Sequence, residues 1–85
     1  MKLVYAEEFR KAFYKLPKRI QERYRSQESL FRASSRDLRL HLKKLKGHPT
    51  VFSFRITRAY RALFAFVEKE TVLMITIGHR KDVYR

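Results

Sequence analysis

The sequence contains no cysteine, only two glycines and two prolines, and no long run of apolar residues. The absence of cysteine excludes disulfide bonds, thiolate nucleophiles and cysteine-based zinc sites. No stretch reaches the roughly 18 apolar residues that a membrane span needs. The N-terminal stretch turns acidic after five residues, which argues against a signal peptide. We therefore expect a cytoplasmic protein without a membrane partner.

Acidic residues are also scarce. Eight Asp and Glu stand against 21 Lys and Arg, which gives a formal net charge of +13. A field of this strength attracts polyanions, and nucleic acid is the first candidate. Two alternatives stay open, because the charge could simply keep a small protein soluble or attract an acidic protein. No segment joins a basic face to a long apolar face, so a membrane-surface helix is not expected.

With 85 residues, the chain is long enough for one domain, residues 1–85, and too short for a second core. Hydrophobic residues make up 45% of the sequence, and seven Phe and five Tyr supply large side chains for burial. We therefore expect a compact fold that needs no metal or covalent link for its stability.

The hydrophobic spacing predicts an α+β fold. Residues 2–5 form a short apolar run that suits a strand at the edge or centre of a sheet, and residues 6–16 have helical spacing. Pro17 then opens a second helix that reaches Phe31, which completes an αα-hairpin. Residues 38–46 have no firm assignment, although alternating leucines in their first half suggest an extended segment.

Residues 51–79 predict a three-stranded antiparallel meander with the helices packed on one face. Aromatic and polar side chains alternate along residues 51–57. A three-residue loop at 58–60 sets Thr57 opposite Arg61, so Arg55 and Arg61 share the face away from the helices. A two-residue loop would bury Arg61 at a cost of several kcal/mol. By the same alternation, a loop at 68–70 puts Ile77 and His79 on the face of Arg61.

The face that carries Arg61 also carries apolar side chains, including Leu63, Ala65, Leu73 and Ile75. An exposed apolar surface of this kind is uncommon on a lone monomer, so we expect an apolar segment of a partner to cover it. The alternative is that the sheet curls enough for its own loops to cover this face.

Several side chains near the end of the chain suit RNA cleavage without a metal. That reaction requires activation of the ribose 2′-OH, protonation of the leaving 5′-oxygen and neutralisation of charge on the phosphorane. Paired guanidiniums can hold a phosphate, cationic groups can stabilise charge, and a tyrosine can stack on a base. The candidate catalytic residues are Arg55, Arg61, His79, Arg80 and Tyr84.

Each candidate also has an ordinary structural explanation. The arginines could be solvated strand residues paired with Glu68, Glu70 or Asp82, and His79 could be a surface or capping histidine. Lys43, Lys44 and Lys46 could form a solvated face, or could track RNA phosphates together with Arg58. The three histidines lack the spacing of metal ligands, so neither a metal site nor a cofactor is expected.

Four segments together resemble the RelE/ParE superfamily of toxins over nearly the whole chain. They are FRKAFYKLP in the αα-hairpin, RLHLKKLKG, VFSFRITRAYRALF and the ending IGHRKDVYR. The resemblance implies a fold ordered strand, helix, helix, strand, strand, strand. It also implies an mRNA endonuclease that acts in the ribosome and is neutralised by a cognate antitoxin protein.

The resemblance also implies roles for single residues. Arg61 matches a phosphate-contacting arginine, and Arg55 matches a basic residue on the preceding strand. Arg80 matches an arginine proposed to stabilise the leaving group, and Tyr84 matches a tyrosine that orients the cleaved nucleotide. His79 lies at a position where members of the family have a basic residue whose identity varies. Ser53 departs from the pattern, because strongly active relatives have a lysine there.

The prediction is therefore a RelE-like endoribonuclease whose partners are the ribosome, mRNA and an antitoxin. Two alternatives stay open: a ParE-like inhibitor of DNA gyrase, against which IGHRKDVYR argues, and a non-catalytic module that binds nucleic acid or an antitoxin.

Overall fold

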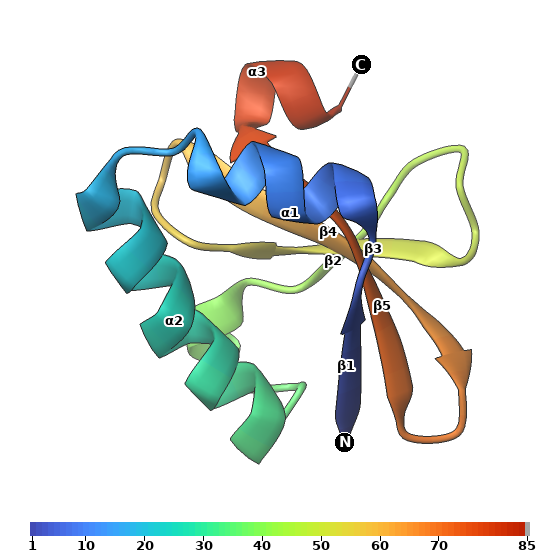
Figure 1. The fold of residues 1–85 in the computed structure, drawn as a ribbon. Helices are drawn as coiled ribbons and strands as arrows, with labels where there is room; N and C mark the ends of the chain where they lie inside the picture. The colour runs from blue at the N-terminus through green and yellow to red at the C-terminus, as the bar shows by residue number, and fades with distance from the viewer. Residues whose placement is uncertain (85) are drawn as a thin grey trace.

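The computed structural model describes residues 1–84 and has an α+β fold, as predicted (Figure 1). Its sheet has five strands in the order β1-β5-β4-β3-β2. All neighbouring strands are antiparallel except β1, which lies parallel to β5 at one edge. The elements are β1 (Lys2–Tyr5), α1 (Glu7–Tyr14), α2 (Lys18–Ala33), η1 (Leu38–Leu40), β2 (Lys43–Lys44), β3 (Val51–Arg55), β4 (Tyr60–Glu68), β5 (Thr71–His79) and α3 (Arg80–Val83).

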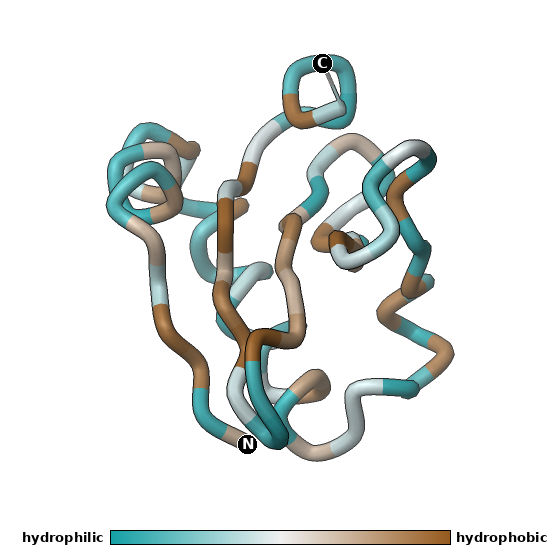
Figure 2. Tube along the Cα trace, turned by 90° about the vertical axis from the view of Figure 1, so that its right-hand side faces the viewer, coloured by the Kyte–Doolittle hydropathy of each residue, from teal (hydrophilic) through white to brown (hydrophobic). Residues whose placement is uncertain are grey.

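Helices α1 and α2 share a single core with one face of the sheet, which we call the helix face. Their aromatic side chains contact one another and those of the strands: Phe9 packs on Tyr24, and Phe31 packs on Phe54 and Phe64. Figure 2 shows the hydrophobic stretches of the chain concentrated along the strands. The opposite face, which we call the open face, carries Arg55 and Arg61.

Helix α2 begins directly after Pro17, as predicted, and fixes the end of β3 through a buried glutamine. The side-chain amide of Gln27 donates to the main-chain oxygens of Arg55, at 2.8 Å, and Arg39, at 3.3 Å. Only 2% of Gln27 is exposed, so these two bonds satisfy an amide that would otherwise be costly to bury. They tie α2 to both β3 and the η1 segment.

The extended conformation suggested for the first half of residues 38–46 is wrong. Leu38–Leu40 form a short 3₁₀ helix, and the extended part comes later, at β2. The cause is local, because the carboxylate of Asp37 accepts a hydrogen bond from the Arg39 N–H at 2.9 Å and caps the turn. His41, in a left-handed conformation with φ of 48°, ends it.

In the β3–β4 hairpin Arg55 and Arg61 share one face of the sheet, as predicted, but the loop lies one residue earlier than predicted. Arg55 pairs directly with Arg61, and the Ile56 N–H donates to the Tyr60 oxygen at 2.9 Å. The loop is therefore 57–59. Thr57 explains the shift, since its Oγ1 accepts hydrogen bonds from the amides of Ala59 and Tyr60 and so starts the turn.

The predicted alternation along β5 fails at a β-bulge. Leu63 pairs with Thr76 whereas Phe64 pairs with Met74, so Ile75 is an extra residue on β5. One extra residue reverses which side chains face the helices. Ile77 is therefore in the core, and His79 pairs with Tyr60 rather than Arg61. The prediction that Ile77 and His79 share the face of Arg61 is wrong.

Part of the open face is covered by the chain itself. Residues 80–83 form α3, which lies against β4 and β5. Leu63 is only 5% exposed, so its predicted exposure is wrong. Ala65, Leu73 and Ile75 are half-buried. The chain thus covers one end of the open face and leaves the other end less protected.

A buried tyrosine should make stability depend on pH in alkaline solution. The Tyr24 hydroxyl donates to Glu28 Oε2 at 2.7 Å. Burial, and to a lesser extent this hydrogen bond, raises the pKa of Tyr24 well above the ordinary 10.0. Above about pH 10 the unfolded chain releases this proton and the folded chain retains it. The free energy of unfolding should then fall by up to about 1.4 kcal/mol per pH unit.

Urea unfolding between pH 8 and 11.5 measures this slope. Tyr24→Phe should make the slope shallower by about one proton, whereas Tyr14→Phe, which changes a 74% exposed tyrosine, should leave it unchanged. Equal slopes in the wild type and both variants would contradict the assignment.

Candidate functional site

The candidate site is built on one cross-strand row of the open face. Arg55 of β3 lies directly opposite Arg61 of β4, which lies directly opposite Gly78 of β5. Neighbouring strands are about 4.8 Å apart, so the two guanidiniums are adjacent. Like charges in this position destabilise a sheet. The arrangement is therefore unfavourable for the fold and favourable for binding an anion.

The guanidinium of Arg61 is held in one orientation by the β3–β4 loop. Its Nη1 donates to the main-chain oxygens of Thr57, Arg58 and Tyr60 at 2.7, 2.8 and 3.2 Å. Burial lowers the pKa of Arg61; Tyr84 opposes this change, and the charges of Arg55 and Arg80 add to it. The group still carries its proton at neutral pH. Its Nη1 is committed to the loop, and the rest of the guanidinium is left for a ligand.

Arg55 has a buried donor without a partner. Its Nε makes no hydrogen bond among residues 1–84 although it is inaccessible to solvent. An unsatisfied buried donor costs about 1–3 kcal/mol, and more when it is charged. While it is buried, Nε cannot itself reach a ligand, but the rest of the half-buried Arg55 side chain lies beside a second guanidinium, and such a pair is suited to contact with phosphate oxygens.

Helix α3 is fixed over the cross-strand row of Arg55, Arg61 and Gly78 by three contacts. The Arg80 N–H donates to the Ala59 oxygen at 2.7 Å, and His79 Nδ1 accepts from the Lys81 N–H at 3.1 Å. Val83 lies over Gly78, where a Cβ would come within 3.2 Å of its Cγ1. Glycine thus lets α3 approach β5 closely.

Tyr84 follows α3 and reaches back to β3. Its hydroxyl donates to Ser53 Oγ at 3.0 Å, and Ser53 is only 2% exposed, whereas Tyr84 is 43% exposed. Nothing in the hydrophobic pattern could reveal this contact, because the two residues are 31 positions apart. Tyr84 also lies close enough to Arg61 to affect its pKa, and we call Arg55 and Arg61 the arginine row.

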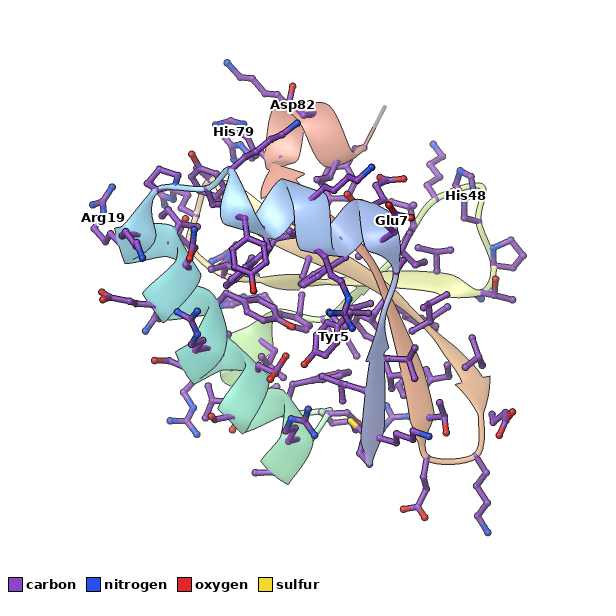
Figure 3. The ribbon with its side chains drawn as sticks, viewed as in Figure 1. Tyr5, Glu7, Arg19, His48, His79 and Asp82 are labelled. Carbon is purple, nitrogen blue, oxygen red and sulfur yellow. The ribbon has the colours of Figure 1, made fainter. Side chains whose placement is uncertain are left out.

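His79 does not join this group. Its ring packs edge-on against Tyr60 with centroids 5.5 Å apart, on the helix-face side of β5. Figure 3 shows His79 and Asp82 at the end of the molecule where α3 begins. Of the five predicted catalytic residues, the structure gathers Arg55, Arg61, Arg80 and Tyr84 and separates His79.

The predicted RNA-binding residues do not form one continuous row. Lys43 and Lys44 are consecutive on β2, so they face opposite sides of the sheet. Lys46 follows in the next turn, and Arg58 is exposed in the β3–β4 loop. Among the described residues no three His, Asp or Glu side chains gather, and no helix is long and apolar enough to cross a membrane.

Several solved structures have the same fold, and they are toxins. A RelB–RelE antitoxin–toxin complex from Methanococcus jannaschii matches with a TM-score of 0.76 and 26% identity, over 95% of this chain and 94% of that chain. A YoeB/ParE toxin from Agrobacterium tumefaciens matches with 0.78 and 18%, over 94% and 99%. YafQ from E. coli matches with 0.81 and 9%, over 99% and 98%.

The resemblance seen in the sequence is thus confirmed at the level of fold: the chain has the fold of RelE/ParE superfamily toxins over nearly its full length. No protein-family model matches the sequence. No curated protein matches it either.

The close approach at Gly78 predicts how α3 can be loosened. Gly78→Ala should push Val83 away and weaken the bond from the Arg80 amide to Ala59, because the added methyl group lies within 3.2 Å of Val83 Cγ1. Amide hydrogen exchange of Arg80 should become several-fold faster. Adding Val83→Ala should restore slower exchange, and unchanged exchange in Gly78→Ala would disprove the packing argument.

Proposed function

We propose that this chain, which has the fold of the RelE/ParE toxins, is a ribosome-dependent mRNA endoribonuclease that acts in the cytoplasm. The observation that carries the proposal is the convergence of Arg55, Arg61, Arg80 and Tyr84 at one end of the open face. A sheet that served only to bind a partner would have no need of two adjacent guanidiniums with a buried unpaired donor.

The reaction joins the ribose 2′-oxygen to phosphorus and breaks the bond from phosphorus to the 5′-oxygen. The products are a 2′,3′-cyclic phosphate and a 5′-hydroxyl, with the 2′-proton lost and one gained by the leaving oxygen. Arg55 and Arg61 hold the phosphate, the side chain of Arg80 stabilises the leaving oxygen, and Tyr84 stacks on a neighbouring base. Lys46 and Arg58 contact the nucleic acid around the site, and Lys44, whose side chain is on the opposite side of β2 from that of Lys43, adds only to the general attraction of RNA.

We assign His79 a positioning role, because its Nδ1 caps α3 and its ring packs on Tyr60. It therefore sets the place of Arg80 and Tyr84 without contacting the phosphate.

An antitoxin is the proposed protein partner, and the M. jannaschii relative occurs in a complex with one. The less protected end of the open face carries an apolar row that crosses four strands: Val4 pairs with Leu73, Leu73 with Ala65, and Ala65 with Val51. Val4 is 42% exposed at the edge strand. Ala65, Leu73 and Ile75 are the residues we propose for antitoxin contact, and the buried Leu63 is not among them.

Primer extension on an mRNA in a translating bacterial extract tests the activity. We expect position-specific cuts that require ribosomes. Arg80→Ala should slow cleavage by about 10²-fold, because it removes a charge that stabilises the transition state. The matched control is Arg19→Ala, which removes another exposed arginine from the start of α2 (Figure 3) and should change the rate less than about twofold. Intact mRNA at protein levels that arrest growth would refute the proposal and make gyrase supercoiling the next assay.

The role of His79 has its own test in the same assay. Asparagine also caps helices, so His79→Asn should keep at least about half of the wild-type rate, whereas His79→Ala should lose about fivefold or more through displacement of α3. A complete loss in both variants would show that the imidazole itself takes part in proton transfer.

A further inference from the structure

The register of β2 distinguishes two lysines that the sequence groups together. Lys43 lies directly opposite Ser53 of β3, whereas Lys44 lies directly opposite Phe52. Directly opposed residues of antiparallel strands project to the same face. Lys43 is therefore on the open face with Ser53 and Arg55, and Lys44 is on the helix-face side.

Lys43 is close to the candidate site through its strand partner. Cβ atoms of directly opposed residues are about 4.5–5.5 Å apart, so the side chain of Lys43 begins next to Ser53. Ser53 Oγ accepts the Tyr84 hydroxyl at 3.0 Å. Arg55 lies two residues along β3 on the same face, about 7 Å from Ser53. The long lysine side chain can thus approach both Tyr84 and the arginine row.

The ammonium of Lys43 is available for a ligand. Lys43 is exposed, and it makes no ion pair or side-chain hydrogen bond among residues 1–84. Arg61 is different, because three loop carbonyls fix its Nη1.

We propose that Lys43 is a catalytic residue whose ammonium contacts a non-bridging oxygen of the scissile phosphate, on the side of the site away from Arg80. This inference rests on the proposed cleavage activity. The ammonium stabilises the charge that accumulates on the phosphorane, from a strand other than the two that carry Arg55 and Arg61. Lys44 contributes only to the general attraction of RNA.

The test compares Lys43→Gln with Lys44→Gln. Both substitutions remove one charge from an exposed residue of the same strand and keep a side chain of similar length, so they weaken general RNA attraction equally. Single-turnover cleavage at saturating ribosome concentration should fall at least about tenfold in Lys43→Gln and less than about twofold in Lys44→Gln. Lys43→Arg, which keeps the positive charge, should recover most of the rate.

Each result has a distinct meaning. Equal losses in the two glutamine variants, with an active wild type, would overturn the role of Lys43 and leave the proposed function intact. Loss in Lys43→Arg as large as in Lys43→Gln would overturn the charge-stabilising role. An inactive wild type would instead refute the proposed function. Thermal unfolding of all variants, expected within about 2 °C of the wild type, shows that the edge strand still forms.

Discussion

The structure of the site depends on the electrostatic cost of burying a guanidinium. Arg61 lies between Ala62 and the loop, and a shift of one residue in the β3–β4 hairpin would turn it into the aromatic core. The hairpin avoids this cost by pairing Arg61 with Arg55. The same register places Ser53 opposite Leu63, which leaves a small polar side chain where Tyr84 arrives. One register therefore orders both the arginine row and the tyrosine beside it.

The site is assembled from segments far apart in the chain, and each is held by main-chain contacts. Gln27 of α2 binds the carbonyl of Arg55, the loop carbonyls bind Arg61, and the Arg80 amide binds Ala59. These bonds use the backbone or one edge of a side chain and leave the charged groups free. A ligand can therefore meet oriented cations without a large rearrangement, which is what preorganised charge stabilisation requires.

Hydrophobic spacing and turn chemistry in the sequence predicted helices α1 and α2, the antiparallel meander of β3, β4 and β5, and the shared face of Arg55 and Arg61. The bulge at Ile75 could not be predicted, because β5 has apolar residues on both of its faces, such as Leu73 on one and Met74 on the other. The hydrophobic pattern therefore gives no sign of where the two faces are exchanged. The prediction of the wrong face for His79 follows from that bulge. Helix α3 was not predicted, because a segment of three charged residues and one valine is too short to show periodicity, and its position depends on a tertiary contact with Gly78.

The unpaired Nε of Arg55 affects how such a protein can evolve. A buried donor without a partner lowers the stability of the free chain, so replacement by a methionine or leucine of similar volume would favour folding while it removed a cation from the arginine row. Under the proposed function, loss of activity at this position would not be opposed by loss of structure. A single substitution would then give a well-folded but inactive descendant, and selection for RNA cleavage would be what keeps the arginine in place.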